Sequence, residues 1–192
     1  MKTFSNILDY TLKFEGLYSN DPYDFGGETY RGIARRKHPN WPGWIIIDKE
    51  KPFRKFPPQI DLLLRPAVEK FYRIRFWDEL YGDEVLETNF EIAQELFDTA
   101  VNMGIHRAIK FLQQALNLLN RNETLFPDLT EDGILGEKTI MAFKILPKED
   151  FSHLYLWMNI FQGTHYAKMM RNNSTQKRFA RGWSKRIQMI KL

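Results

Sequence analysis

The sequence contains no cysteine, which excludes disulfide scaffolds and thiolate chemistry and fits synthesis in a reducing compartment. It also lacks an apolar run long enough to span a bilayer, and no apolar segment of the signal-peptide kind follows the N-terminus. We therefore expect no membrane span and synthesis in the cytoplasm without a signal peptide. A substrate outside the membrane would have to be reached by release or export through other proteins.

Acidic residues are absent after position 150, whereas eight basic residues lie between 151 and 192. The preceding part of the chain holds 20 basic and 24 acidic residues, and the whole chain has a formal net charge of +4. A basic region attracts polyanions, which include cell-wall polymers and nucleic acid, although a solvated surface is the commoner explanation. Because no nucleic-acid-reading motif occurs, we expect no nucleic-acid partner.

Motifs for metal binding and for nucleophilic catalysis are also missing. The four histidines (His38, His106, His153 and His165) are scattered, and neither an HExxH pair nor a Gly-x-Ser-x-Gly elbow occurs. We expect no metal and no cofactor. Carboxylate chemistry is the remaining arrangement that has a mechanism.

The sequence does contain a glutamate in an unusual place. Residues 4–12 carry apolar side chains at helical spacing after the suitable N-cap Thr3, and Glu15 falls near the middle of their stripe. Gly16 follows at once, so we expect Glu15 at the C-terminus of this helix. Apolar surroundings and the negative end of a helix dipole both disfavour the ionised carboxylate. A carboxyl group that stays protonated near neutral pH can act as a general acid.

The loop after this glutamate supplies further carboxylates. Asp21 and Asp24 lie in a Pro- and Gly-rich stretch that cannot be helical, where hydration keeps an aspartate ionised. One segment thus offers two carboxyl groups in different environments, as glycoside hydrolysis requires. The alternative is that Glu15 is exposed at a frayed helix end and the aspartates only cap turns.

Residues 15–33 carry the pattern Glu-Gly-x-Tyr-x-Asn-Asp-Pro-x-Asp-x-Gly-Gly-x-Thr-x-x-Gly-Ile, which resembles the opening motif of glycoside hydrolase family 108. Members of this family are bacteriolytic N-acetylmuramidases of phages and prophages (endolysins) with a lysozyme-like fold. The resemblance implies that Glu15 is the catalytic glutamate. The spacing of Glu15, Asp24 and Thr29 also resembles the Glu, Asp, Thr triad of phage-type lysozymes, with one residue fewer before the threonine. Asp24 is therefore the better second carboxylate, and Asp21 is the reserve.

Aromatic residues and one departure surround this motif. Leu17 stands where the family usually has a second glycine, and it would narrow the cleft or alter specificity if that glycine lets the backbone approach the sugar. Tyr18 and Tyr30 are expected to line the sugar site. Trp41 and Trp44, in a Pro-rich stretch, are candidates either for stacking on sugar faces or for packing a lid onto the core.

Two later segments resemble the same family. Residues 96–104 resemble the start of its C-terminal region, where the matching helix of lysozyme-like folds lines the cleft. Asp98 and Asn102 are therefore expected to bind substrate or brace the catalytic glutamate, or else to be ordinary surface residues. Residues 132–139 read Asp-Gly-x-x-Gly-x-Lys-Thr, which resembles the peptidoglycan-binding-like region that follows the catalytic segment. Such a loop can also serve packing alone.

The expected architecture is mainly α, a lysozyme-like helical fold with a short β or loop segment near the active site. Periodicity and capping signals predict helices after Thr3, from Pro66, from a capping box at Thr88–Glu91 to Gly104, over 106–121, over 137–146 and from about Asp150 to Asn172. They also predict a last basic helix, with an apolar face formed by Phe179, Trp183, Ile187 and Ile190. A short strand is predicted at Ile45–Ile47. We expect a catalytic segment over 1–95 and a peptidoglycan-binding-like region over 96–192, packed together as one compact unit.

The predicted activity is hydrolysis of the β-1,4 bond between N-acetylmuramic acid and N-acetylglucosamine in the glycan strands of bacterial peptidoglycan, by a monomer that acts at the cell wall. Glu15 is expected to protonate the glycosidic oxygen, Asp24 to hold a water or stabilise the oxocarbenium-like transition state, and Thr29 to help position that water. A carboxyl separation of about 5 Å predicts retention, and roughly 6.5–9.5 Å predicts inversion. The alternatives are a lytic transglycosylase, which needs only the glutamate, and a non-catalytic wall-binding or secretion-associated protein.

Overall fold

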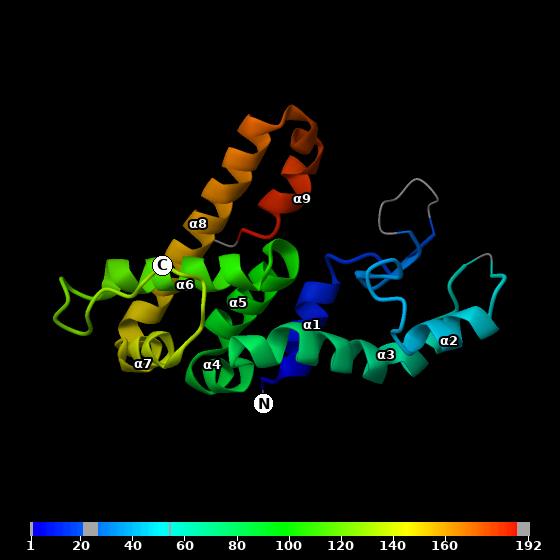
Figure 1. The fold of residues 1–192 in the computed structure, drawn as a ribbon, viewed down its shortest axis with the longest axis horizontal. Coiled ribbons are helices and arrows are strands. Elements are labelled where there is room, and N and C mark those ends of the chain that lie inside the picture. The colour runs from blue at the N-terminus through cyan, green and yellow to red at the C-terminus, as the bar shows by residue number, and fades with distance from the viewer. Residues whose placement is uncertain (1, 21–26, 54, 188–192) are drawn as a thin grey trace. The chain divides into compact units, whose positions relative to one another are not determined.

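The computed structural model describes residues 2–20, 27–53 and 55–187. This described chain is mainly helical with one small antiparallel sheet, so the predicted fold class is confirmed (Figure 1). The chain divides into two compact units, residues 1–75 and residues 76–192. Within the described ranges, every helix is too short or too polar to cross a membrane.

The first unit combines three helices with a three-stranded sheet. Its elements are α1 (Phe4–Leu12), β1 (Tyr18–Ser19), β2 (Thr29–Tyr30), β3 (Ile33–Ala34), α2 (Gly43–Lys49) and α3 (Pro58–Tyr72). The predicted N-cap Thr3 is confirmed: its backbone N–H donates to the Asn6 side chain at 2.9 Å. The apolar face of α1 is buried, and α1 packs against α3.

The sheet is a meander in the order β1-β2-β3, in which both pairs are antiparallel. Tyr30 in β2 pairs with Tyr18 in β1 and with Ile33 in β3. The turn between β2 and β3 has two residues, Arg31 and Gly32, with φ of 47° and 78°. Positive φ at both central residues is typical of a type I′ turn, whose twist matches that of the flanking strands. The result is a tight hairpin at the end of the motif that begins with Glu15.

The predicted strand at Ile45–Ile47 is wrong, because these residues lie in α2. Three isoleucines in a row favour a strand by propensity alone. However, Trp44 and Ile47 are buried while Ile45 is exposed, which is the three-residue spacing of one helix face. Packing against α3 therefore decides the conformation.

The predicted helix start at Pro66 is also wrong. Helix α3 begins at Pro58, in the first turn, where a missing backbone N–H costs nothing. Pro66 lies inside the helix at an exposed position, and the buried face is formed by Ile60, Leu64 and Val68. This amphipathic face continues the helix across the proline.

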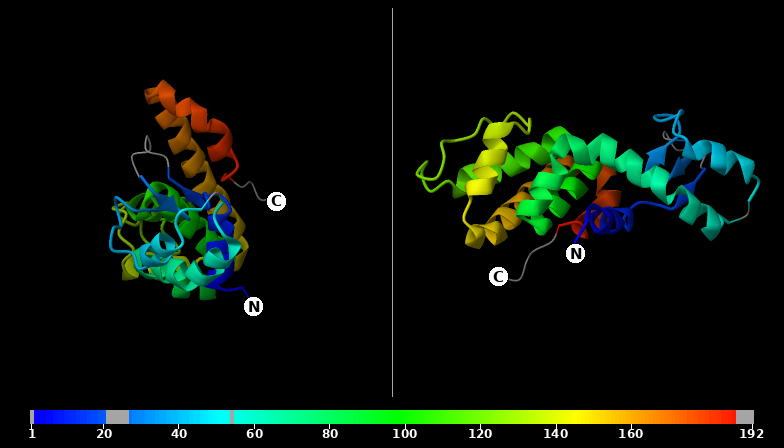
Figure 2. Two further views of the ribbon diagram at one scale, coloured as in Figure 1. Left: turned by 90° about the vertical axis from the view of Figure 1, so that its right-hand side faces the viewer. Right: turned by 90° about the horizontal axis from the view of Figure 1, so that it is seen from below.

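The second unit is built from helices. The chain enters it through the π-helix η1 (Arg73–Trp77) and the 3-10 helix η2 (Asp78–Leu80). It continues with α4 (Gly82–Thr88), α5 (Phe90–Met103), α6 (Ile105–Leu119), α7 (Glu137–Ile145), η3 (Lys148–Asp150), α8 (Phe151–Asn172), η4 (Ser174–Phe179) and α9 (Ala180–Ser184). Helices α5, α6 and α8 pack against one another, and α4 packs against α5. Figures 1 and 2 show α9 lying beside α8, which it contacts. The predicted helices over this region are confirmed for α5, α6, α7 and α8.

Two details of the second unit differ from the prediction. The N-cap of α5 is Asn89, whose side chain accepts from the backbone N–H of Ile92 at 3.0 Å, whereas the Thr88 hydroxyl donates to the Glu84 carbonyl within α4. The last basic helix is only the short α9, preceded by the 3-10 turns of η4, and Ile190 lies outside the described residues.

Candidate active site

The predicted catalytic glutamate lies beyond the end of α1. The helix ends at Leu12, and the Glu15 backbone N–H donates to the Leu12 carbonyl at 3.3 Å. The prediction that Glu15 ends the helix next to Gly16 is therefore wrong by about one turn, and the Glu15 side chain is half-buried. The chain leaves the helix early and carries this carboxyl group toward the sheet.

The Glu15 carboxyl group lies against the turn of the β2–β3 hairpin. A Cβ atom at Gly32 would lie 3.0 Å from Oε2 of Glu15 and 2.6 Å from the hydroxyl oxygen of Tyr72. The Tyr72 hydroxyl in α3 donates to the Arg31 carbonyl at 2.8 Å, and the Arg31 N–H donates to the Leu17 carbonyl at 2.9 Å. Gly32 is thus required twice, once for its positive φ and once for this close approach.

The other predicted catalytic residues are placed only in part. Thr29 lies in β2, half-buried, and its hydroxyl donates to the Gly27 carbonyl at 3.2 Å. Asp21 and Asp24 fall in residues 21–26, outside the described residues. The structure thus brings Glu15 and Thr29 to the same hairpin region, and the role of each stays a prediction.

A buried carboxylate that the sequence analysis missed, Glu28, holds the sheet together. Its side chain is 9% exposed and accepts from the Tyr18 hydroxyl at 2.8 Å, from Arg35 at 2.7 Å and from Lys51 at 2.6 Å. Arg35 also pairs with Asp48 of α2. The signal for this pair was present, because a two-residue turn at 31–32 places positions 28 and 35 opposite each other, where unlike charges attract.

The electrostatics of this network keep Glu28 ionised. Burial raises the pKa of its carboxyl group, whereas the hydrogen bonds from Lys51, Arg35 and Tyr18 lower it. Together the hydrogen bonds outweigh burial, so the pKa of Glu28 is lower than usual. Burial and the bond to Glu28 raise the pKa of the Tyr18 hydroxyl to about 12. Tyr18 therefore donates a proton to this bond at all ordinary pH values, and its predicted contact with sugar stays a prediction.

Tyr30 is fully buried and belongs to a second polar cluster. Its ring stacks between Trp41 and Phe56, and its hydroxyl donates to Asp61 of α3 at 2.6 Å. Arg31 donates two hydrogen bonds to the same carboxylate, at 2.8 and 3.1 Å. Asp61 was also missed, since nothing in its sequence surroundings marks it. Tyr30 serves as a core residue here, and its predicted substrate contact is untested.

Trp41 and Trp44 are both buried, and their indole N–H groups donate to backbone carbonyls, of Ala67 at 3.3 Å and of His38 at 2.8 Å. Of the two alternatives from the sequence, packing onto the core is therefore the one observed. Leu17, in contrast, is 38% exposed next to the hairpin.

Asp98 and Asn102 belong to the second unit, where both have partners. The Asp98 carboxylate is buried and accepts two hydrogen bonds from Arg186, at 2.9 and 3.1 Å. The amide oxygen of Asn102 accepts from the Tyr166 hydroxyl at 2.7 Å. Both side chains thus bind other residues of the second unit. Their predicted contacts with substrate or with Glu15 remain predictions. Groups of three or more potential metal ligands do not occur among the described residues.

Two known protein families match consecutive segments of the chain. The family model described as Glycosyl hydrolase 108 matches residues 8–104, and the model described as Predicted Peptidoglycan domain matches residues 107–188. The two matches meet after α5, whereas the predicted boundary at 95/96 falls inside that helix and stays a prediction. No curated protein matches the chain significantly.

A solved structure, that of SagA from Brucella abortus, is similar along nearly the whole chain. It has 18% sequence identity and a TM-score of 0.56, over 98% of this chain and 96% of that chain. At this identity the likeness shows a shared fold. The first family model spans just over half of the 192 residues and includes Glu15, Thr29 and the hairpin. The chain therefore belongs to glycosyl hydrolase family 108 and carries a C-terminal predicted peptidoglycan domain.

Proposed function

We propose that this protein hydrolyses the β-1,4 bond between N-acetylmuramic acid and N-acetylglucosamine in peptidoglycan, with Glu15 as the general acid. The observation that carries the proposal is the approach of the Glu15 carboxyl group to Gly32 at the hairpin turn, inside the region matched by the hydrolase family. The glycine lets the carboxyl group pack closely against the turn, which fixes its position. We place this activity at the bacterial cell wall, after release or export from the cytoplasm.

The assignment of the acid rests on a comparison of the two glutamates near the hairpin. Glu28 is held as a carboxylate by three donors, so it has no proton to give to a leaving group. Glu15 follows α1, half-buried, and its carboxyl group lies beside the turn. A general acid must give a proton to the leaving group, and the three donors around Glu28 exclude it from that role, which leaves Glu15 as the candidate of the two.

For the second carboxylate we propose Asp24, with Asp21 as the reserve and Thr29 positioning the attacking water. Thr29 lies on β2, and both aspartates precede this strand in the sequence, after β1. Comparison of Asp24→Asn with Asp21→Asn distinguishes them, because replacing the catalytic carboxylate should lower kcat by about two orders of magnitude or more.

The test of the function is mass spectrometry of muropeptides released from purified peptidoglycan. The wild-type protein should produce reducing N-acetylmuramic ends, and Glu15→Gln should produce almost none because the general acid is lost. Glu50→Gln is the matched control, since Glu50 is an exposed glutamate after α2 in the same unit, and it should cleave like the wild type.

Other outcomes would support the alternatives. Anhydro-muramic ends would identify a lytic transglycosylase. If neither wild type nor variant cleaves, while both still sediment with peptidoglycan, the protein is a binding module and the hydrolytic proposal fails. Cleavage by Glu15→Gln at the wild-type rate would remove Glu15 from its proposed role.

A further inference from the structure

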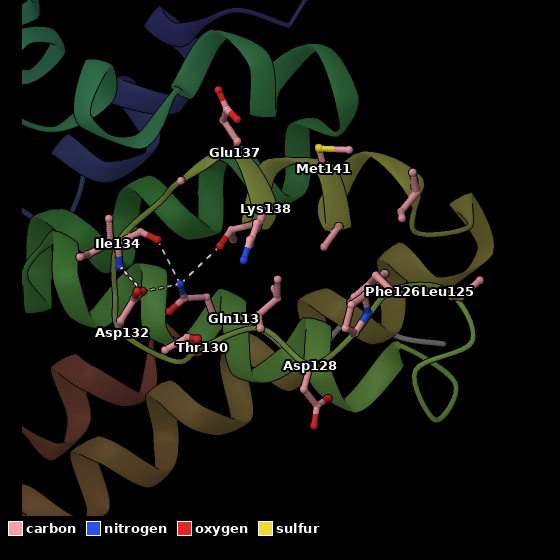
Figure 3. Close-up of a pocket in the computed structure, with 16 residues that line it drawn as sticks. Gln113, Leu125, Phe126, Asp128, Thr130, Asp132, Ile134, Glu137, Lys138 and Met141 are labelled. Carbon is pink, nitrogen blue, oxygen red and sulfur yellow. Dashed lines mark hydrogen bonds between the residues drawn. The ribbon is translucent and has the colours of Figure 1, made fainter.

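The second unit contains a cavity of about 770 Å³ between α7 and the loop that connects α6 to α7 (Figure 3). Its lining runs from Gln113 in α6, through loop residues 125–136, to Ile145 at the end of α7. All of these residues lie in the region matched by the predicted peptidoglycan domain. A volume of this size is typical of sites for small molecules or short peptides.

A row of amide side chains on α6 holds the loop in place. Gln113, Asn117 and Asn120 lie on one helix face, at spacings of four and three residues. The Asn117 side chain donates to the Leu129 carbonyl at 2.9 Å and accepts from the Leu129 N–H at 2.8 Å. Asn120 donates to the Asp128 carboxylate at 2.7 Å. The loop is therefore fastened to the helix at several points along its length.

Gln113 fastens the Asp-Gly turn of the loop. This residue is buried; its side chain accepts from the Gly133 N–H at 2.8 Å and donates to Asp132 at 2.9 Å and to the Ile134 carbonyl at 3.0 Å, as the dashed lines in Figure 3 partly show. Gly133 has a φ of 69°, and a Cβ there would lie 2.5 Å from the carbonyl oxygen of His106. The cavity wall is thus preorganised, which lowers the cost of binding.

In the Asp-Gly-x-x-Gly-x-Lys-Thr motif of residues 132–139, the Lys138 side chain takes no part in these hydrogen bonds. Asp132 and Thr139 bond to Gln113, but Lys138 has no hydrogen bond or ion pair with any other described residue. In Figure 3 the Lys138 side chain extends from α7 toward the loop, whereas the Glu137 carboxylate points away from it. Within the described part of the chain this ammonium group therefore has no partner, and the carboxylate of a ligand would provide one.

The cavity wall also contains three carboxyl groups: Asp128 accepts from Asn120, Asp132 accepts from Gln113, and Glu137 points away from the loop in Figure 3. Much of the remaining wall is apolar. Ile134, Met141 and Ile145 are large apolar side chains that line the cavity and remain exposed, Met141 by 63%. Phe126 and Leu129 close the side formed by the loop. Apolar surface that is open to solvent on a preformed concave wall is typical of a binding site.

We propose that this cavity binds a short peptide with small apolar side chains and a free carboxylate, which pairs with Lys138. The peptide stem of peptidoglycan has this chemistry. The inference rests on the proposed function and deepens it, because it assigns the second unit to the peptide part of the substrate while the first unit acts on the glycan.

The test is calorimetric titration of the full-length protein with N,N′-diacetyl-Lys-D-Ala-D-Ala, which has one carboxylate, and with the C-terminal amide of this peptide. The free acid should bind the wild type about tenfold more tightly than it binds Lys138→Met, while the amide should bind both proteins equally. Lys148→Met, which removes an exposed lysine outside the cavity, should bind like the wild type. Met141→Ser should weaken binding of both peptides, because the apolar wall serves each of them.

Three results would overturn the proposal. In the first, wild type and Lys138→Met bind the free acid equally tightly. In the second, the protein binds the peptide-free disaccharide but neither peptide. In the third, the wild type self-associates and Met141→Ser abolishes this self-association. The last result would make a second copy of the chain the occupant. Because the titration needs no cleavage, its failure is separate from failure of the muropeptide assay, which tests the first unit.

Discussion

Glu95 in α5 is a carboxyl group that the fold keeps away from water. It is 5% exposed, and its Oε1 accepts from the Thr99 hydroxyl at 3.1 Å. Burial, and after it the charge of Asp98, raise the pKa of Glu95 to about 8, so its carboxyl group is protonated at neutral pH. In the unfolded chain the pKa of this glutamate is the usual value of about 4.3. The free energy of unfolding therefore falls by about 1.4 kcal/mol per pH unit between these two pKa values and is level above the higher one.

Glu95→Gln should remove this pH dependence, since glutamine has a similar shape and does not titrate. We expect the free energy of unfolding of the variant to rise relative to the wild type by roughly 3–4 kcal/mol between pH 5 and pH 8, measured by urea denaturation. Glu87→Gln, at an exposed position in α4, should differ from the wild type by the same amount at both pH values. A constant difference for Glu95→Gln would mean that the folded protein holds an ionised glutamate there.

Gly32→Ala should impair both folding and activity. The new Cβ would meet the Tyr72 hydroxyl and the Glu15 carboxyl group at a positive φ, so we expect a loss of about 2–4 kcal/mol in the free energy of unfolding. Peptidoglycan cleavage should fall further than the remaining folded fraction explains, because Glu15 is displaced. Gly16→Ala tests the geometry: a Cβ there meets no atom within 4 Å, and its stability should match the wild type within about 0.5 kcal/mol. Equal losses for both variants would contradict the close approach.

At the scale of elements, the sequence predicts helices well where one apolar face is long. Helices α5 and α6 have regular faces, and Gly104 between them carries a φ of 92° that ends one helix and begins the next. The prediction fails for α2, because seven residues give too little periodicity to outweigh the strand propensity of isoleucine. It also fails at the end of α1, where glycine indicated a later stop than the chain takes.

Pro66 offers a test of element stability inside α3. A proline in a helix removes a backbone hydrogen bond and crowds the preceding turn, and this one is exposed, so its ring fills no core space. Pro66→Ala should therefore raise the free energy of unfolding by about 1–3 kcal/mol, measured by chemical denaturation. Pro58→Ala is the matched control, since proline is favoured in the first turn, and it should change stability little or lower it slightly. A destabilised Pro66→Ala would show instead that the proline at this position stabilises the folded protein.

At the scale of the whole chain, sequence reasoning finds the residues of the local motif and misses the partners that folding brings to them. Glu15, Tyr18 and Thr29 lie within one continuous pattern, so a single segment reveals them. Asp61 and Tyr72 reach the same hairpin from α3, more than 25 residues away in sequence, and only the packing of α3 shows that they hold its turn and its buried tyrosine. The second carboxylate remains an inference from the motif.

The charge distribution follows the same division. All eight basic residues after position 150 belong to the second unit, and one of them, Arg186, is buried with Asp98 instead of forming part of the solvated basic surface that the count suggests. A count of charges predicts net attraction for polyanions, but it cannot distinguish a buried cation from an exposed one.

The Arg186–Asp98 ion pair also has a consequence for the order of folding. It joins residues 88 positions apart, so it closes a long loop, whereas α5 and α6 are neighbours along the chain. Closing a long loop costs more entropy, so we expect this pair to form after the folding transition state. Arg186→Met, which leaves Asp98 buried without its charge partner, should then speed unfolding strongly and leave the refolding rate almost unchanged in stopped-flow experiments. In kinetic terms, we expect the ion pair to lengthen the lifetime of the folded second unit by slowing its unfolding, without speeding its folding.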